Sequence, residues 1–503
     1  MKRLVLFHYH FLPGGVTSVV RDIIGAVSEA GNIEEVVLCC DAAMGVTGLP
    51  PDPAPLPIRV YDLPEMGYRQ RESYDRSRFQ HERRAILGAM TDLEGPETLF
   101  WVHNHHLGKN PALTAALSDY ARKGGSPLLL HIHDFPECGR WDNYLFLKEY
   151  AEEWYPRGER VWYGVINRRD YRILSESGVP EGRLFYLPDC APLDSGEERS
   201  EASRRRARKS VMECCIRSGF SFDEKAPLLV YPVRTIRRKN LIEAFLIASM
   251  AGCNLVVTLP ANSAPERPYE SVVAGLSREP FYRGAWALSR SCPGSFPDVM
   301  RAADLILSSS VMEGFGLFFL ETKSRGTNFV ARSLEVMDDF KGLDREGVYD
   351  ILPVPEAYAH REEMKERYVK RIARLPLGKD HVQHLTERTL AVLSQGPLDF
   401  AFLDVPRQAA ILKERGAREA FTKTGKRLVD KIFTMAGTFR DQGIDPAPFC
   451  TDACKKRLMS LLEDVTRHET QAESWTVDQD TVLDRFLKPE MIRLLFDYKG
   501  EET

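Results

Sequence analysis

The chain has 503 residues, of which 43% are hydrophobic and 28% charged, and its formal net charge is −4. It can form two hydrophobic cores and is too long for one ordinary domain. So small a net charge excludes a general attraction to nucleic acid, and we expect no nucleic-acid partner. No apolar run is long enough to span a membrane, and no apolar signal segment opens the chain. We therefore expect a cytoplasmic protein without a transmembrane segment.

The first predicted strand, Arg3–His8, leads into a loop with two adjacent glycines, Gly14 and Gly15. An amphipathic helix is predicted over Val19–Ser28. Glycines let a backbone approach a phosphate or a sugar closely. The loop lacks the three-glycine dinucleotide fingerprint and the lysine of a P-loop, which argues against a nicotinamide enzyme or an NTPase.

A polar stretch between residues 67 and 84 is rich in arginine and includes Arg69, Arg71, Arg76 and Arg78. Loops that project from an α/β domain often form walls of a binding site. Arginine there indicates a ligand with a carboxylate or a phosphate. If the protein transfers a group to an acceptor substrate of this kind, Arg69 and Arg71 are candidate acceptor-binding residues.

A strand over 127–134 ends in His131, His133 and Asp134. Alternation places the two histidines on one face. Metal binding is one explanation, because His-x-His with an acid holds zinc in some hydrolases and the segment 101–106 offers more imidazoles. Such hydrolase barrels carry the pair on their first strand, whereas this pair follows about 130 residues of α/β sequence. We predict no metal site.

In the second half of the chain, the strand Leu228–Val233 is followed by Arg234–Asn240, which contains four cations. Open α/β sheets bind their ligands at the carboxyl ends of the strands. Arginine and lysine there would neutralise a bound diphosphate and would stabilise the extra negative charge that it carries as a leaving group. The alternative explanation is a solvated basic turn.

The segment Ser310–Glu321 follows another predicted strand and carries Glu313 and Glu321 with seven residues between them. Its glycines permit an unusual turn, and a helix is predicted to start near Leu317. A helix N-terminus favours an anion, and carboxylates accept hydrogen bonds from sugar hydroxyls. The alternative is that Glu313 caps the helix and Glu321 faces water.

Together these motifs resemble the retaining GT-B glycosyltransferases of the large family numbered four. In that family an arginine and a lysine about five residues apart hold the donor diphosphate, and Arg234 and Lys239 match them. The second glutamate of the pair, here Glu321, binds the nucleotide ribose, and the first, Glu313, lies beside the transferred sugar. The turn that contributes amides to the sugar and the phosphates corresponds to Gly314, Phe315, Gly316 and Leu317.

The resemblance extends to the first half of the chain. The loop with Gly14 and Gly15 matches the family's contact to donor phosphate and acceptor. His133 matches a histidine that contacts the donor sugar, close to the acceptor. The implied catalytic residues are His133, Glu313, Arg234 and Lys239.

The resemblance implies an α/β fold with two Rossmann-like domains facing a cleft and a C-terminal helical extension. The expected domains are an acceptor domain over 1–190, a donor domain over 191–375, and an extension over 376–503 that packs in part on the acceptor domain. The extension also offers a surface for a homo-oligomer. Ten cysteines without a Cys-x-x-Cys pair predict reduced thiols.

The implied function is transfer of a sugar from a UDP- or GDP-sugar to a hydroxyl of a small sugar, a sugar acid or a glycan, with retained anomeric configuration. No cofactor and no metal ion are implied, because the cations stabilise the departing diphosphate. Two alternatives stay open: a nucleotide-sugar epimerase of the same fold, and a catalytically silent nucleotide-sugar binding protein.

Overall fold

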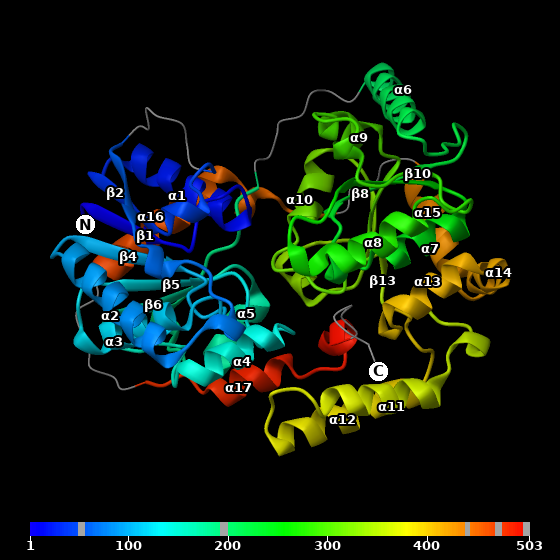
Figure 1. Ribbon diagram of the computed structural model, residues 1–503. Coiled ribbons are helices and arrows are strands. Elements are labelled where there is room, and N and C mark those ends of the chain that lie inside the picture. The colour runs from blue at the N-terminus through cyan, green and yellow to red at the C-terminus, as the bar shows by residue number, and fades with distance from the viewer. Residues whose placement is uncertain (49–55, 192–199, 438–442, 468–474, 496–503) are drawn as a thin grey trace. The chain divides into compact units, whose positions relative to one another are not determined.

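The computed structural model of the chain describes residues 1–48, 56–191, 200–437, 443–467 and 475–495 (Figure 1). It divides into two compact units. Unit 1 contains Met1–Pro192 and Ala447–Phe486, and unit 2 contains Leu193–Pro446 and Leu487–Thr503. The predicted extension, 376–503, is thus shared between the units, and its last eight residues lie outside the described part.

Unit 1 is built on a seven-stranded parallel sheet. The strands are β1 (Arg3–Phe7), β2 (Glu35–Cys40), β3 (Ile58–Asp62), β4 (Thr98–His103), β5 (Leu128–Ile132), β6 (Val161–Val165) and β7 (Leu184–Tyr186). Their spatial order is β3-β2-β1-β4-β5-β6-β7. The chain proceeds outward from β1 to β3 and then resumes on the other side of β1, so the sheet has a topological switch point between β1 and β4.

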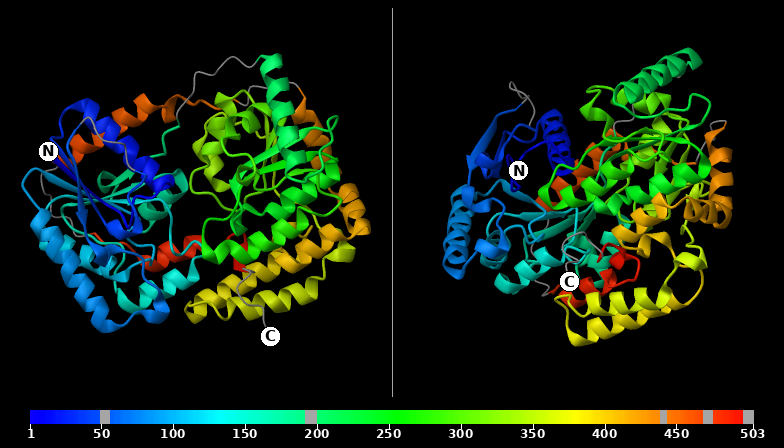
Figure 2. Two further views of the ribbon diagram at one scale, coloured as in Figure 1. Left: turned by 45° about the horizontal axis from the view of Figure 1, so that its top comes forward. Right: turned by 45° about the vertical axis from the view of Figure 1, so that its right-hand side comes forward.

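Helices cover both faces of this sheet (Figure 2). They are α1 (Gly15–Ala30), α2 (Arg76–Leu93), α3 (Pro111–Lys123), α4 (Trp141–Tyr150), α5 (Arg168–Glu176), α16 (Thr451–Arg467) and α17 (Gln479–Phe486). Local sequence sets their ends, as α3 illustrates. Asn110 accepts hydrogen bonds from the first turn, proline follows it, and Gly124 ends the helix with a φ of 72°.

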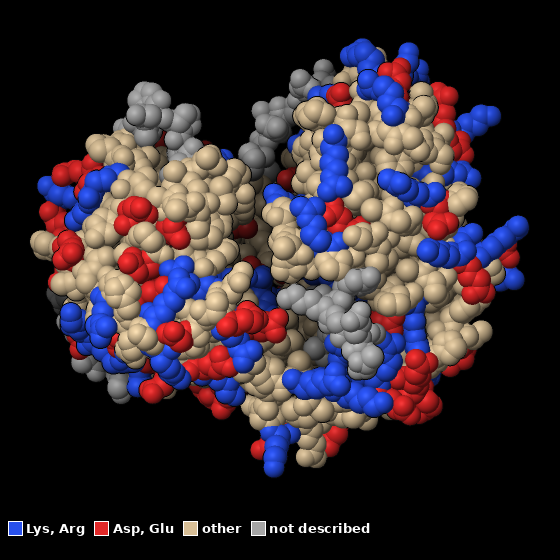
Figure 3. Space-filling model, viewed as in Figure 1, with Lys and Arg blue, Asp and Glu red and all other residues tan. Residues whose placement is uncertain are grey.

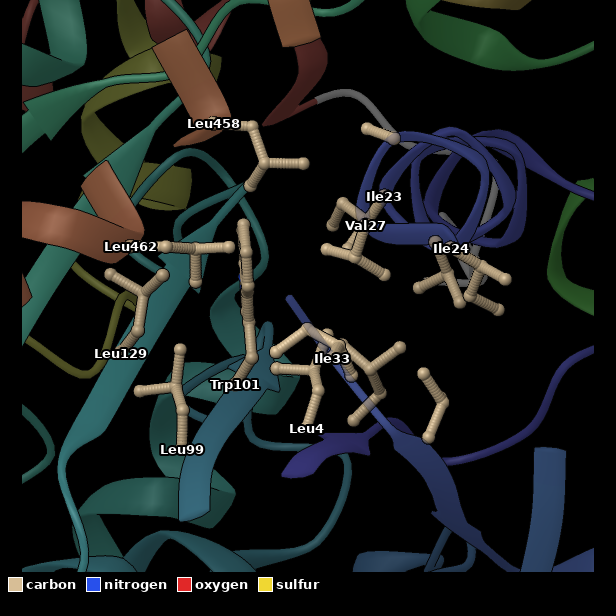
Figure 4. Packing of buried hydrophobic residues seen from close by; sticks show 14 of the residues in the cluster. Leu4, Ile23, Ile24, Val27, Ile33, Leu99, Trp101, Leu129, Leu458 and Leu462 are labelled. Carbon is tan, nitrogen blue, oxygen red and sulfur yellow. The ribbon is translucent and has the colours of Figure 1, made fainter. Parts of the chain in front are cut away.

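The core of unit 1 includes a helix from the far end of the chain. Leu458 and Leu462 of α16 pack with Trp101 of β4 and with Ile23 and Val27 of α1 (Figure 4). These side chains are at most 7% exposed. Burial of a leucine stabilises a fold by about 1.5–3 kcal/mol, so α16 is part of unit 1 rather than an appendage.

Unit 2 is built on a six-stranded parallel sheet. The strands are β8 (Leu228–Arg234), β9 (Asn254–Leu259), β10 (Gly284–Ala285), β11 (Leu305–Ser308), β12 (Phe329–Arg332) and β13 (Val348–Tyr349). Their order is β10-β9-β8-β11-β12-β13, so the direction of growth reverses between β8 and β11. This is a second topological switch point.

Unit 2 has helices around its sheet, and one of them, α7, is itself covered by other helices. The helices are α6 (Glu201–Arg217), α7 (Leu241–Ala251), α8 (Arg267–Leu276), α9 (Phe296–Ala302), α10 (Leu317–Ser324), α11 (Arg361–Ile372), α12 (Lys379–Ser394), α13 (Val405–Lys413), α14 (Arg415–Thr424) and α15 (Lys426–Ala436). The α7 sequence is apolar on nearly every face and is almost wholly buried. Helices α13, α14 and α15 contact it. They provide the cover that such a helix requires.

A buried ion cluster joins the sheet of unit 2 to the segment after α12. Arg332 of β12 is 1% exposed and donates to Glu243 of α7 at 2.6 Å and to Asp399 at 2.7 Å. The hydroxyl of Tyr349 donates to Glu243 at 2.8 Å. The two carboxylates neutralise and hydrogen-bond the guanidinium group, which a buried charge requires.

Cys214 and Cys292 form a disulfide, so the expectation of reduced thiols throughout is wrong. The expectation used local spacing, whereas these cysteines lie 78 residues apart in sequence.

No helix of the described residues is long and apolar enough to cross a membrane. On the face shown in Figure 3, acidic and basic side chains are interspersed.

Candidate active site

The loops after β8 and β11 meet because these strands are neighbours in the sheet of unit 2. The amide of Val311 donates to the carbonyl of Arg238 at 2.9 Å. The hydroxyl of Ser309 donates to the carbonyl of Asn240 at 3.0 Å, and that of Ser310 donates to the carbonyl of Arg238 at 3.2 Å. These bonds fix the two predicted motifs to one another at the switch point.

Glu313 lies at the centre of this site and is paired with two cations. Its carboxylate accepts from the ammonium of Lys239 and, at 2.8 Å, from the guanidinium of Arg238. The side chains of Glu313 and Lys239 are only 10% and 13% exposed. Burial alone would raise the pKa of Glu313, but the charges of Lys239 and Arg238 outweigh it and lower the pKa to about 2. Glu313 is therefore a carboxylate at neutral pH.

The sequence analysis named Lys239 and Glu313 and did not single out Arg238. The structure brings all three together, and Arg238 also donates to the carbonyl of Met312 at 2.8 Å. The available signal was the cluster of four cations after β8. Spacing could not separate Arg238 from its neighbours, because they lie in a short 3₁₀ turn, Arg237–Lys239, that ends at Asn240 with a φ of 50°.

Arg234 and Glu321 occupy the same end of the sheet of unit 2. Arg234 is the last residue of β8 and is partly buried, and it forms no ion pair with the described residues. Glu321 lies in α10, where burial raises the pKa of its carboxyl and Arg325 opposes the change. Its carboxylate accepts no hydrogen bond from the described part of the chain. Both charged groups are therefore available to a ligand.

The turn before α10 requires glycine at one position. Gly316 has a φ of 95° and precedes the helix without a side-chain cap. A Cβ there would lie 3.1 Å from the ring of Phe319. Phe315 is 3% exposed and packs on Phe340, which anchors the turn. Gly314 and Leu317 flank these two residues, so the predicted amides lie between β11 and α10.

In unit 1, the glycine loop follows β1, next to the first switch point. Gly15 opens α1, and Gly14 precedes it in an extended conformation. A Cβ at Gly15 would meet nothing within 4 Å, and one at Gly14 would meet only the carbonyl of Leu12 at 3.9 Å. The fold itself therefore leaves open space beside both glycines.

His133 belongs to a group of buried histidines at the ends of β4 and β5. Its Nε2 lies 3.1 Å from Nδ1 of His103, and its ring centre lies 4.2 Å from that of His131. Burial lowers the pKa of His133 to about 4 and lowers those of His103 and His131 as well. The imidazoles are neutral at pH 7. The carboxylate of Asp134 pairs with Arg140 at 3.0 Å.

The two arginines predicted to bind an acceptor are both engaged within unit 1. Arg69 donates to Glu82 at 2.7 Å, and its side chain is 11% exposed. Arg71 is more exposed, at 40%, and pairs with Glu149. The acceptor role of both residues stays a prediction, and their present contacts attach the loop around them to α2 and α4.

An exposed aromatic group that sequence reasoning missed lies beyond the end of β1. Tyr68 is 42% exposed, and its ring lies 5.0 Å from Tyr9 and 5.4 Å from His10. The ammonium of Lys109 is 5.4 Å from the same ring. Sugars stack on aromatic faces of this kind, and a nearby cation favours an acidic group. No periodicity in the sequence marks these scattered residues.

Solved structures share this architecture. HepE of Anabaena in complex with UDP-glucose matches with a TM-score of 0.50 and 12% identity, over 92% of this chain and 100% of that one. A UDP-forming α,α-trehalose-phosphate synthase of Burkholderia vietnamiensis matches with the same TM-score and identity, over 93% of this chain and 98% of that one. The fold is GT-B, as predicted, and the protein belongs to the class of GT-B glycosyltransferases.

No family model matches the chain. The mannosylglucosyl-3-phosphoglycerate synthase of Petrotoga mobilis is 34% identical over 511 residues, which cover 99% of this chain and 100% of that protein. The chain belongs to the family of this synthase.

Proposed function

We propose that the protein is a retaining hexosyltransferase that moves a mannosyl group from a nucleoside diphosphate sugar to a hydroxyl of glucosyl-3-phosphoglycerate. The name of the Petrotoga relative supplies the product, mannosylglucosyl-3-phosphoglycerate. The acceptor is then a sugar acid that carries a phosphate and a carboxylate. The observation that carries the proposal is the pairing of Glu313 with Lys239 and Arg238 at the switch point of unit 2.

The donor diphosphate is proposed to bind Arg234 and Lys239. As the bond between sugar and phosphate breaks, negative charge grows on the departing diphosphate, and fixed cations stabilise it. Lys239 is held in place by Glu313 before any ligand arrives, so little reorganisation is needed. These cations replace a divalent metal ion on the diphosphate. The arrangement agrees with membership of glycosyltransferase family four, which we propose as the wider classification.

Glu313 is proposed to act through its charge rather than as an acid. A carboxyl with a pKa of about 2 stays ionised at neutral pH and has no proton to give. Beside the transferred sugar it stabilises the positive charge that develops on the ring. Retention follows if the departing phosphate accepts the acceptor's proton on the same face of the sugar. No residue is then needed as a nucleophile.

The remaining predicted residues are proposed to hold the donor. Glu321 accepts hydrogen bonds from the ribose hydroxyls, and the amides of Gly314, Phe315, Gly316 and Leu317 contact the sugar and the phosphates. The open space beside Gly14 and Gly15 supports a close backbone contact with donor phosphate. His133 donates a hydrogen bond from a neutral imidazole to a sugar hydroxyl.

An assay of mannosyl transfer tests the proposed function. The purified protein is incubated with glucosyl-3-phosphoglycerate and, in separate reactions, GDP-mannose or UDP-mannose, and the product is identified by mass spectrometry. Proton NMR of the first-formed product gives its anomeric configuration. We expect a mannosylated product with the configuration of the donor. An inverted product would contradict the retaining mechanism.

Donor-only reactions separate the alternatives. An epimerase would convert the nucleotide sugar without an acceptor, and a silent binding protein would show a thermal shift with the donor but no turnover. A ligand at one hundred times its dissociation constant adds about 2.7 kcal/mol to the free energy of unfolding, so a thermal-shift screen of GDP and UDP identifies the base.

A further inference from the structure

Three buried histidines at the carboxyl ends of β4 and β5 form a compact group that the proposed transfer does not explain. His103 ends β4 and pairs in register with His131 of β5, and His133 follows two residues later. Their exposed fractions are 0%, 2% and 7%. Each offers a ring nitrogen, and these nitrogens all lie within 4.8 Å of one another.

Three of the six ring nitrogens are buried without a hydrogen-bond partner among the described residues. His103 Nδ1 and His133 Nε2, 3.1 Å apart, form a hydrogen bond between two of the rings. Nε2 of His103 and both nitrogens of His131 are buried without a partner among the described residues. Buried polar atoms are nearly always hydrogen-bonded or bound to an ion, because leaving them unpaired costs free energy. The group therefore points to a missing ligand.

The geometry fits a tetrahedral metal ion. Zinc binds imidazole nitrogen at about 2.0–2.1 Å, which places two ligand nitrogens about 3.3 Å apart. The separation between His103 and His133 is 3.1 Å. All three nitrogens lie within 4.8 Å of one another, so the third ring would turn toward the other two to complete the set.

The donor set selects the kind of ion. Imidazole suits zinc and the neighbouring late transition metals, whereas magnesium and calcium require oxygen ligands. Three protein ligands leave a fourth position for water. His131 also lines a cavity of about 200 Å³ with Trp101 and Asp189, which gives an ion and its water a route to the group.

We propose that His103, His131 and His133 bind one transition-metal ion, with zinc as the best match. The ion would join the ends of β4 and β5 and fix the ring of His133. This site lies in unit 1, whereas the cations proposed to bind the donor diphosphate lie in unit 2. Its ligands are therefore imidazoles of unit 1 and not the cations proposed to bind the diphosphate. The sequence analysis predicted no metal site, although it noted further imidazoles in the segment 101–106, and the proposed ion departs from that prediction.

The metal content of the protein tests the site without any substrate. The full chain is purified without a polyhistidine tag, saturated with zinc, passed through gel filtration and measured by elemental mass spectrometry. We expect one zinc per chain. After removal of zinc with a chelator, cobalt(II) is expected to give the strong visible absorption of a tetrahedral site. Substoichiometric zinc and octahedral cobalt in the wild-type protein would overturn the proposal.

Variants locate the ion. Loss of an outer partner lowers metal affinity about 10- to 100-fold, so His103→Asn and His131→Asn are expected to lower zinc affinity by more than about 100-fold. The matched control is His105→Gln, because His105 is equally buried but bonds the carbonyl of Trp154 at 3.1 Å. The exposed His81→Ala controls for surface binding. Equal zinc in all four variants would show adventitious binding and contradict the site.

The melting temperature of the wild-type protein tests zinc binding without any variant. Zinc is expected to raise the melting temperature of the wild-type protein, and dipicolinate is expected to lower it. No shift in either direction would contradict binding to the native state. All three measurements use the protein without donor or acceptor, so they can fail while the proposed transfer succeeds, and the reverse.

Discussion

The switch points of the two sheets have equivalent topology and opposite chemistry. In unit 2 the site is charged, since Glu313 is surrounded by Lys239 and Arg238. In unit 1 the ends of β4 and β5 carry neutral imidazoles, and burial lowers their pKa values. The comparison shows that a parallel sheet provides the place for a site, and that the loops after its strands provide the chemistry.

The buried ion cluster of unit 2 gives the largest expected effect on stability. Arg332 pairs with both Glu243 and Asp399 and is 1% exposed. Arg332→Met leaves Glu243 without its cation and Asp399 with Arg493 at 3.5 Å, and we expect the free energy of unfolding to fall by about 3–5 kcal/mol. Urea unfolding followed by circular dichroism measures it. Arg415→Ala, at an 86% exposed side chain, is the control and should change stability by less than about 0.5 kcal/mol. A loss below about 1 kcal/mol for Arg332→Met would mean that the cluster is not formed.

Removal of a cation at the charged switch point of unit 2 is expected to lower kcat strongly. Lys239→Ala removes a cation from the proposed diphosphate site, and loss of one such stabilising group lowers kcat about 100- to 1,000-fold. Initial rates of transfer measure it. Arg205→Ala removes an exposed cation of unit 2 and should leave kcat unchanged. Wild-type turnover in Lys239→Ala would remove the basis of the proposed donor site.

Metal dependence distinguishes the two switch points directly. We expect full transfer without added magnesium or manganese, because side-chain cations stabilise the diphosphate. If a chelator abolished transfer and manganese or magnesium restored it, the proposed role of Arg234 and Lys239 would be wrong. Restoration by zinc alone would instead locate the requirement in the histidine group of unit 1.

The ion pairs of Glu313 predict how stability depends on pH. Its pKa falls from 4.5 to about 2 on folding, so the folded state favours the ionised form. The stabilisation is fully present above pH 4.5 and is lost as the pH falls toward 2; at neutral pH it amounts to about 3 kcal/mol. Urea unfolding of wild type and Glu313→Gln at pH 7, 5 and 4 measures it. The difference should shrink at the lowest pH, and a constant difference would contradict the charge pairing.

The sequence predicted β5, β8 and β11, because buried parallel strands are short apolar runs, whereas it did not predict β4. It could not predict the spatial order of those strands. Leu305 of β11 pairs in register with Leu229 of β8, 76 residues earlier in the chain, and this pairing depends on tertiary contacts. The amphipathic pattern of α16 predicts that the helix packs, but it does not specify α1 as its partner.

Side-chain contacts were harder to predict than strands. Family spacing selected Arg234 and Lys239, whereas the contact of Arg238 with Glu313 depends on a left-handed Asn240 that no spacing rule shows. The histidine group was only half visible, since His103 lies 30 residues from its partner His133 and on another strand. Residues within one segment can be placed by periodicity, but residues that meet across strands require the register.

The smallest effects concern the two arginines predicted to bind the acceptor, and these effects should separate them. Arg71 forms an exposed ion pair, so Arg71→Ala should change the free energy of unfolding by less than about 1 kcal/mol. Because its side chain can exchange Glu149 for an acceptor phosphate, we expect the KM for glucosyl-3-phosphoglycerate to rise about tenfold with kcat unchanged. Arg69 is nearly buried against Glu82, so Arg69→Ala should destabilise the fold instead, by about 1–3 kcal/mol. An unchanged KM in Arg71→Ala would limit that residue to its pair with Glu149 and would favour Tyr68 and Lys109 as the acceptor surface.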